Sequence, residues 1–311
     1  PDLIGTGFFL LGAIQKYLIS VFDYLSIMSS SLSPLIRPAE LLHLLKEDHT
    51  LVILDARNSA NPRKTYEQGH LDRTLYIDPN LELADIKANL AEGGRHPLPT
   101  VADFCGTLGK LGITPESRIV VYDDQFGANS AARLWWMLRA LGHAKVQVLE
   151  GGIQAGLGAG IPSSSNWEAA NPTASYPAKT WLWPTVGINE VEAVATDPDH
   201  LVIDVRSSER YRGESEPIDL IAGHIPGAIN VPLTVNLDET GNFLSPEKLR
   251  EKYAAIFGEI PTEKIIVHCG SGVSACHTLL ALDHAGFEVP NLYVGSWSEW
   301  SRNGKAIGKS V

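Results

Sequence analysis

The chain repeats the same order of sequence elements twice. An apolar run that ends in Asp-x-Arg occurs at residues 50–59 (TLVILDARNS) and again at residues 200–209 (HLVIDVRSSE). Short runs rich in Val, Leu and Ile are typical of strands buried in a parallel sheet. A chain that carries this pattern twice is constrained to fold as two similar domains.

The rest of each half follows in the same order. Later segments match in pairs: 69–78 with 223–232, 117–124 with 263–270, 130–142 with 274–286, and 146–153 with 292–300. The third pair has helical composition and ends at glycine, whereas the others contain apolar strands. Strands that alternate with helices predict parallel α/β domains. The predicted fold class is α/β, with two tandem domains, each a parallel sheet flanked by helices.

Composition between the repeats predicts the domain boundaries. The stretch 156–177 is rich in Gly, Ser, Pro and Asn and lacks periodicity, as expected of a linker. We predict a first domain at residues 34–155, a linker at 156–184 and a second domain at 185–305.

Residues 1–33 precede the repeats as an extension of different composition. Residues 3–22 are mostly apolar, and about 20 such residues can span a bilayer. Gln15 and Lys16 interrupt this stretch, however, and no basic segment precedes it. We expect Met28 to be the natural start of the protein and no membrane contact; a membrane or surface anchor is the alternative.

Overall composition narrows the possible partners. The net charge is −11 and no basic run exists, so nucleic acid is not an expected partner. The three cysteines, Cys105, Cys269 and Cys276, form no CxxC pair and no metal-ligand spacing with histidine. Neither a metal site nor a disulfide framework is therefore expected. The sparse cysteines favour a reducing, cytoplasmic compartment.

The loop after the third strand of the second half is predicted to carry the chemistry. Cys269 ends the apolar run, and small residues lead from it into the next helix at Ser274. Sites in parallel α/β domains lie at the carboxyl ends of strands. Backbone N–H groups of such a loop, with a helix N-terminus behind them, favour an anion. We therefore expect Cys269 to act as a thiolate nucleophile. Gly270 and Gly272 would supply backbone conformations that are costly for other residues.

The first half offers an internal comparison for this loop. Asp123 stands where the second half has Cys269, and the loop to Ser130 is two residues longer than the loop from Cys269 to Ser274. A carboxylate cannot serve as a sulfur nucleophile. The first half is therefore predicted to be catalytically silent.

Together these features resemble the tandem rhodanese family, and most closely its 3-mercaptopyruvate sulfurtransferase branch. The most specific motifs are CGSGVSA at 269–275, GHIPGA at 223–228, RYRGE at 210–214 and GSWSEW at 295–300. The resemblance extends from about Pro34 to Asn303. It implies two rhodanese-like domains, the first silent and the second catalytic.

The resemblance also implies a mechanism. In that family the cysteine takes sulfur from 3-mercaptopyruvate, which leaves a cysteine persulfide and pyruvate. A thiol acceptor such as thioredoxin or a small thiol, or cyanide, then removes the sulfur, and no cofactor takes part. Cys269 matches the nucleophile, and Arg210 matches the arginine that binds the substrate carboxylate. Ser271 matches a loop serine that assists transfer together with a histidine, His96, and an acid, for which Asp78 is the candidate.

Neighbouring residues are assigned by their setting. The remaining loop residues, expected to line the substrate site, are Gly270, Gly272, Val273 and Ser274. Structural roles are predicted for the Asp204–Arg206 pair, His224, Trp297, Trp300, and the thiols Cys105 and Cys276.

The chain departs from the family pattern at one position. The 3-mercaptopyruvate branch often has a second arginine behind a Glu-Pro, where this chain has Ile218.

Three alternative functions remain open. The first is a thiosulfate:cyanide sulfurtransferase, although the uncharged Gly-Ser-Gly loop favours a substrate with a single negative charge. A rhodanese module used only for protein binding is the second alternative. A phosphatase, the third, is disfavoured because it needs an arginine where Ala275 stands.

Overall fold

The computed structural model describes residues 32–309. The apolar stretch 3–22 and Met28, with the predictions made for them, lie outside these residues. In the described part of the chain, none of the helices is both long enough and apolar enough to cross a membrane.

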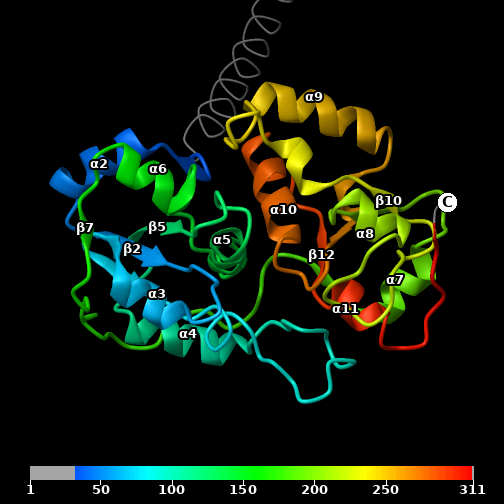
Figure 1. The fold of residues 1–311 in the computed structure, drawn as a ribbon, viewed down its shortest axis with the longest axis horizontal. Helices are drawn as coiled ribbons and strands as arrows, with labels where there is room; N and C mark the ends of the chain where they lie inside the picture. The colour runs from blue at the N-terminus through cyan, green and yellow to red at the C-terminus, as the bar shows by residue number, and fades with distance from the viewer. Residues whose placement is uncertain (1–31, 310–311) are drawn as a thin grey trace, which may run out of the picture. The chain divides into compact units, whose positions relative to one another are not determined.

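The first half is built on a parallel five-stranded sheet of order β1-β6-β5-β2-β4 (Figure 1). Its strands are β1 (Leu35–Ile36), β2 (Leu51–Asp55), β4 (Thr74–Tyr76), β5 (Arg118–Tyr122) and β6 (Val146–Leu149). Its helices are α2 (Pro38–Glu47), α3 (Pro62–Gln68), α4 (Val101–Lys110), α5 (Ser130–Ala140) and α6 (Gly152–Gly158). A separate antiparallel pair joins β3 (His70–Leu71) to β7 (Ser163–Ser164).

The second half is built on a parallel sheet of order β10-β9-β11-β12-β8. Its strands are β8 (Thr185–Val186), β9 (Leu201–Asp204), β10 (Ile229–Asn230), β11 (Ile265–His268) and β12 (Asn291–Tyr293). Its helices are α7 (Ile188–Val194), α8 (Ser208–Arg212), α9 (Pro246–Phe257), α10 (Ala275–His284) and α11 (Ser296–Trp300), with 3₁₀ turns η1 (Leu233–Asn236) and η2 (Thr262–Lys264). Read from β8, this sheet has the same strand order as the first, which confirms the predicted duplicated α/β fold.

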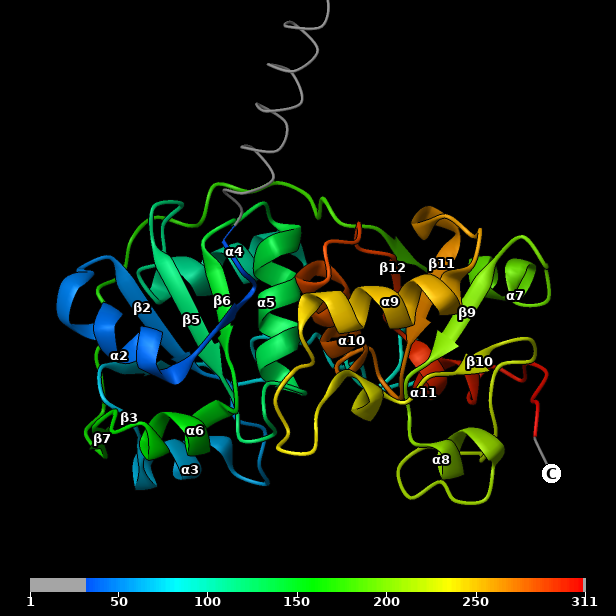
Figure 2. The ribbon, with the colours of Figure 1, turned by 90° about the horizontal axis from the view of Figure 1, so that it is seen from above.

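The core follows from the alternation of strand side chains between the two faces of a sheet. In β5, Ile119 and Val121 join the hydrophobic cluster that also contains helix α5, whereas Val120 and Tyr122 join the cluster on the other face. The first of these clusters continues through helix α10 into the second half. Helices α5 and α10 pack against each other between the two sheets (Figure 2). The ends of β5 and β11 are therefore held at a shared apolar core.

Each Asp-x-Arg motif forms a buried ion pair at the end of its strand, as predicted for the second half. Arg206 Nη2 lies 2.6 Å from Asp204 Oδ2, and Arg57 Nη2 lies 2.6 Å from Asp55 Oδ2. Arg206 also reaches a second carboxylate, because its Nη1 lies 3.1 Å from Glu216 Oε2. The pairs are thus alike, but among the ion pairs of residues 32–309 the arginine of the second-half pair also binds a second acidic side chain, Glu216.

Two boundaries differ from the sequence prediction. Helix α6 continues to Gly158, so it runs into the stretch expected to be linker from residue 156. Its glycines suggest a loop, yet Gly156 is buried within the helix, and a Cβ there would lie 2.9 Å from a methyl carbon of Leu71, so the two residues pack closely. The segment 292–300, expected to contain an apolar strand, also contains a short helix, α11.

Candidate active site

The loop that begins at Cys269 is held in place from its outer side. The Cys269 side chain follows β11 and is buried, with 1% of the residue exposed. The carbonyl oxygens of Cys269 and Gly270 accept hydrogen bonds from the amides of Trp297 (3.1 Å) and Ser298 (2.8 Å). The Cys269 amide donates to Ser296 Oγ at 3.1 Å. The start of α11 therefore fixes the first residues of the loop.

The backbone N–H groups of the next loop residues, 270–274, donate no hydrogen bond to any of residues 32–309. Gly272 has a φ of 74°, and a Cβ there would lie 2.3 Å from the carbonyl oxygen of Val294, so only glycine fits. Helix α10 begins directly behind these residues. The loop thus offers several amides and a helix N-terminus to an anion next to Cys269.

The first half shows what the equivalent loop can hold. Asp123 follows β5 as Cys269 follows β11, and its carboxylate is fully buried. It accepts hydrogen bonds from the amides of Gln125 (2.9 Å), Gly127 (2.8 Å), Asn129 (3.1 Å) and Ala131 (3.1 Å). Burial raises the pKa of Asp123, and these four amides oppose the rise. A loop of this design therefore surrounds an acceptor group with backbone N–H donors.

A segment of the first half crosses to the second half beside this loop. This crossing segment, residues 79–100, connects β4 to α4 without a helix or strand (Figure 1). The amide of Gly93 donates to Glu299 Oε1 at 3.0 Å, and Asn303 Nδ2 donates to the carbonyl of Ala91 at 2.9 Å. The segment is therefore anchored to α11 and the turn that follows it.

The structure brings His96 and Ser271 together, although they belong to different halves. His96 Nδ1 lies 2.8 Å from Ser271 Oγ, within hydrogen-bonding distance. Burial lowers the pKa of His96 to about 4, and the charges of Arg95 and Arg133 contribute. His96 is therefore neutral at physiological pH, and its ring can exchange a hydrogen bond with the serine hydroxyl.

Asp78 is engaged elsewhere. Its Oδ2 accepts a hydrogen bond from the Tyr76 hydroxyl (2.9 Å), and its Oδ1 accepts from the amides of Asn80 (2.9 Å) and Leu81 (3.2 Å). In the part of the chain that the structure describes, no hydrogen bond or ion pair joins Asp78 to His96. The carboxylate closes its own turn, as aspartates commonly do, so its role as partner of His96 stays a prediction that no contact supports.

Arg133, which the sequence analysis did not single out, links the crossing segment to the loop. It lies on α5, is 1% exposed, and donates to the carbonyls of Gly272 (Nη1, 3.3 Å) and His96 (Nη2, 3.1 Å). Burial lowers its pKa, whereas Cys276 and Cys269 raise it, so both thiols lie within electrostatic reach. Since arginine stays charged in proteins, Arg133 brings a positive charge to the thiols from the first half.

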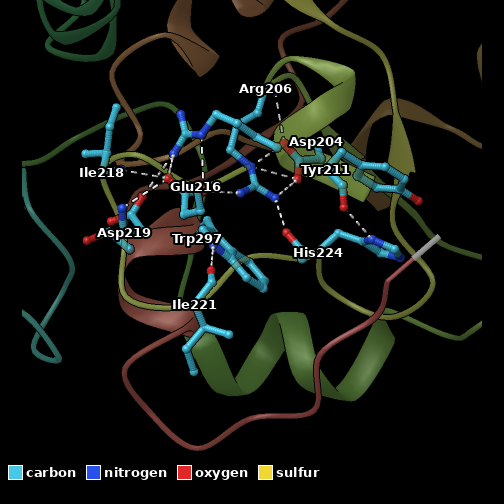
Figure 3. Close-up of polar contacts among 12 residues, drawn as sticks. Asp204, Arg206, Tyr211, Glu216, Ile218, Asp219, Ile221, His224 and Trp297 are labelled. Atoms are coloured by element: carbon cyan, nitrogen blue, oxygen red, sulfur yellow. Dashed lines mark hydrogen bonds and ion pairs between the residues drawn. The ribbon is translucent and has the colours of Figure 1, made fainter. Parts of the chain in front are cut away.

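Arg210 is held by two acidic side chains beside the loop. Its Nη2 donates to Glu216 Oε1 (2.7 Å) and to Asp219 Oδ2 (3.2 Å), and its Nε donates to Glu216 Oε2 (3.1 Å). Figure 3 shows Glu216 and Asp219 converging on this network, with Ile218 beside it. A Cβ at Gly270 would lie 3.4 Å from Arg210 Nη2. The guanidinium is therefore fixed next to the residue that follows Cys269.

A cavity adjoins this arginine. It has a volume of about 430 Å³ and is lined by residues 205–210 and 232–234 and by Ser274. Val273 lies on the other side of the loop, where it lines a small cavity with His96 and Arg133. A second large cavity, of about 460 Å³, lies at the start of β2 in the first half and includes none of the predicted site residues. Of these three cavities in the described residues, the one at Arg210 and Ser274 borders the end of the Cys269 loop and is large enough for a small substrate.

The residues assigned structural roles are buried or bonded to backbone. Trp297, Trp300 and Cys105 are no more than 2% exposed. His224 Nδ1 lies 2.8 Å from the carbonyl oxygen of Tyr211, and the two rings stack. Burial raises the pKa of the Cys276 thiol to about 12, so Cys276 is a packed, protonated thiol at neutral pH. This burial and these contacts agree with the structural roles predicted for these residues.

The lowered pKa of His96 predicts how stability depends on pH. Because its folded-state pKa of about 4 lies below the usual value of 6.5, the unfolded chain binds more protons between these values. The free energy of unfolding should therefore fall as the pH drops from 6.5 towards 4. Urea unfolding at pH 7 and pH 5 should show a smaller difference for His96→Gln than for wild type. Equal differences would contradict a neutral, buried His96.

Comparisons with known proteins identify the family. The model of the rhodanese-like domain matches residues 37–159 and 188–303. The "Probable 3-mercaptopyruvate sulfurtransferase" of Pseudomonas aeruginosa is 38% identical over 257 residues, which cover 80% of this chain and 89% of that protein. The "Thiosulfate sulfurtransferase" of Rattus norvegicus is 34% identical over 275 residues, covering 85% and 89%. The solved structure of 3-mercaptopyruvate sulfurtransferase from Leishmania major matches with a TM-score of 0.74 and 30% identity, covering 86% of this chain and 74% of that one. The chain therefore belongs to the rhodanese-like domain family.

Proposed function

We propose that this chain is a sulfurtransferase that moves sulfur from 3-mercaptopyruvate, through a persulfide on Cys269, to a thiol or cyanide. One observation carries the proposal. Cys269 stands before a loop whose amides are free within the described residues, at the place where the first half surrounds Asp123 with four amides. Such a loop favours a negatively charged sulfur next to Cys269. The relatives are named as sulfurtransferases, which supports the same class of reaction.

The first step forms one sulfur–sulfur bond and breaks one carbon–sulfur bond. The Cys269 thiolate attacks the sulfur of 3-mercaptopyruvate, and the electron pair of the broken bond passes to carbon as the enolate of pyruvate. The enolate then takes up a proton, which balances the reaction. The hydroxyl of Ser271, 2.8 Å from the neutral ring of His96, is placed to hold or pass such a proton.

The second step regenerates the enzyme. An acceptor thiolate, from a small thiol or a protein such as thioredoxin, or a cyanide ion, attacks the outer sulfur of the persulfide. The bond between the two sulfurs breaks, and its electron pair returns to Cys269 as a thiolate. In both the thiolate and the persulfide the charge lies near the free amides and the buried guanidinium of Arg133, so the same groups stabilise both resting forms.

The proposed donor follows from charge. Residues 270–274 carry no charged side chain, and Arg210 beside them is largely neutralised by Glu216 and Asp219. A site of this kind suits the single carboxylate of 3-mercaptopyruvate better than the two charges of thiosulfate. Thiosulfate is the second candidate donor, favoured by the similarity to the thiosulfate sulfurtransferase of rat.

A paired steady-state assay tests the proposal. With a thiol acceptor, we expect kcat/KM for 3-mercaptopyruvate to exceed that for thiosulfate by at least about tenfold, since the second charge of thiosulfate would enter a partly desolvated site without a cation to pair with it, which costs about 1.4 kcal/mol or more. A higher kcat/KM for thiosulfate would reject the proposed donor. Absence of transfer from either donor in freshly reduced protein would reject the enzyme itself and favour a protein-binding module.

A further inference from the structure

We propose that Arg95, which comes from the first half, joins Arg210 to form a two-guanidinium site that binds the carboxylate of the sulfur donor. Arg95 lies in the crossing segment one residue before His96. The inference rests on the proposed function. It adds a substrate-binding residue from the half that lacks the nucleophile.

The position of Arg95 is fixed by the backbone around it. The preceding residue, Gly94, has a φ of 78°, and a Cβ there would lie 2.5 Å from the carbonyl oxygen of Gly295. Only glycine allows this approach. The following residue, His96, is held through Ser271 and through its own carbonyl, which accepts from Arg133. Both neighbours of Arg95 are thus tied to the catalytic half or to α5.

The two guanidinium groups converge on the same point of the loop. A Cβ at Gly270 would lie 3.0 Å from Arg95 Nη2 and 3.4 Å from Arg210 Nη2. Gly270 directly follows Cys269, so both groups lie over the residue beside the nucleophile. A Cβ at this position would be tightly packed against the Arg95 guanidinium and in van der Waals contact with that of Arg210. The uncharged loop is therefore flanked by two cations that come from elsewhere in the chain.

Asp219 holds these two groups together. Its carboxylate is fully buried, and it accepts from Arg95 Nε (Oδ1, 3.0 Å), Arg95 Nη2 (Oδ2, 3.3 Å) and Arg210 Nη2 (Oδ2, 3.2 Å). A shared carboxylate fixes the spacing of the guanidinium groups before any substrate arrives. Within residues 32–309, Nη1 of Arg95 and Nη1 of Arg210 have no hydrogen-bond acceptor. Each fork therefore keeps donors for a ligand.

The charged groups around Asp219 carry a net positive charge that a monoanion can neutralise. Arg302 donates to Asp219 Oδ1 as well, at 3.1 Å. Three guanidinium groups (Arg95, Arg210 and Arg302) thus meet two carboxylates (Asp219 and Glu216), which leaves one positive charge unbalanced. Planar guanidinium forks match the planar carboxylate of an α-keto acid.

This arrangement also accounts for the aliphatic residue at position 218. Ile218 lies between Glu216 and Asp219 in the sequence, and 53% of it is exposed. Figure 3 shows its side chain to one side of the network. It supplies no charge to the site. With Arg95 entering from the first half, a second cation near Gly270 does not require an arginine at this position.

Steady-state kinetics of Arg95→Gln test the inference. The loss of a charged hydrogen bond to the carboxylate should raise KM for 3-mercaptopyruvate about 10- to 100-fold, with kcat within about threefold of wild type. Arg95→Lys, which keeps the charge without the fork, should lie between. Arg302→Gln is the matched comparison, because it removes the same unit of charge from the same carboxylate but is not among the groups nearest Gly270; KM should therefore rise clearly less than in Arg95→Gln. Unchanged KM in Arg95→Gln, or an equal effect in Arg302→Gln, would overturn the inference.

A binding measurement separates this inference from the proposed function. Pyruvate serves as the probe, and calorimetry on Cys269→Ser protein requires no turnover. Adding Arg95→Gln to Cys269→Ser should raise the Kd of pyruvate by about the factor by which it raises KM. An unchanged thermal midpoint of unfolding shows that the double variant is folded. An unchanged Kd would reject Arg95 as a carboxylate ligand. If wild type fails to turn over 3-mercaptopyruvate but pyruvate binding depends on Arg95, the proposed reaction is wrong and the carboxylate site stands.

Discussion

Replacing Cys269 by serine is expected to abolish sulfur transfer, with kcat/KM at least about 1000-fold below wild type for every donor. A serine hydroxyl is not ionised at neutral pH and cannot form the persulfide on which both steps depend. The side chain is nearly isosteric, and the loop is held by backbone contacts to Trp297 and Ser298, so the fold should be unchanged. Release of sulfide or transfer to a thiol acceptor measures the loss.

The chain supplies a matched control for this variant. Cys105 is a buried thiol on α4 whose Sγ lies 3.6 Å from the carbonyl oxygen of Ala178. Cys105→Ser should keep kcat/KM within about threefold of wild type, because the residue lies outside the site. Comparable activity in Cys269→Ser and wild type would contradict the assignment of the nucleophile, whatever Cys105→Ser does.

Arg206→Met is expected to lower the free energy of unfolding by about 3–5 kcal/mol, because it leaves a buried carboxylate without its cation. Asp204 is fully buried and accepts from Arg206 at 2.6 Å (Nη2 to Oδ2). Arg206 also lies 4.7 Å from the centroid of the Trp297 ring, so its stacking is lost as well. Urea unfolding followed by far-UV circular dichroism measures the change. A loss below about 1 kcal/mol would show that this pair contributes no more than a surface ion pair.

Arg57→Met distinguishes the effect of a lost ion pair on protein stability from its effect on substrate binding at Arg210. Arg57 forms the same kind of pair with Asp55 in the first half, also at 2.6 Å (Nη2 to Oδ2), so its loss should destabilise the protein by a similar amount. Only Arg206 also binds Glu216, which in turn holds Arg210. Below the unfolding transition, KM for 3-mercaptopyruvate should therefore rise in Arg206→Met and stay near the wild-type value in Arg57→Met. An equal effect of both variants on KM would contradict this link between the ion pair and Arg210.

Features determined by short stretches of sequence could be predicted. The apolar runs of β2, β5, β9 and β11 are visible in the sequence because fully buried parallel strands are apolar at almost every position. Their repetition also predicted the duplicated domains. The end of α6 at Gly158 was not apparent from the sequence, because Gly156 fits closely against Leu71 inside the helix, whereas composition alone treats glycine as a sign of a loop.

The nucleophile loop could be predicted for the same reason, but most of its surroundings could not. Cys269 and the glycine residues that follow it are adjacent in sequence. Arg95 and Arg133 reach the loop from the first half, and Asp219, which binds Arg95, lies in a distant part of the second half. Nothing local in the sequence around α5 distinguishes Arg133 from a surface arginine. Only the packing of α5 against α10 buries it beside the thiols.

The carboxylates illustrate the same limit. The family resemblance implied an acid near His96, for which Asp78 was the candidate, but its carboxylate binds Tyr76 and the amides of its own turn. The acidic residue whose charge acts on His96 is Asp219, which raises the pKa of that histidine against the effect of burial. Asp219 lies far along the chain in the second half, so no spacing rule links it to His96.

The central claim, that Cys269 carries the transferred sulfur, is tested most directly by intact-protein mass spectrometry. Reduced wild-type protein is incubated with 3-mercaptopyruvate without an acceptor, and a portion is then treated with excess dithiothreitol. We predict a mass increase of one sulfur atom in wild type, its removal by the thiol, and no increase in Cys269→Ser. The claim would be contradicted if wild type gained no sulfur, or if Cys269→Ser gained a thiol-sensitive sulfur atom to the same extent.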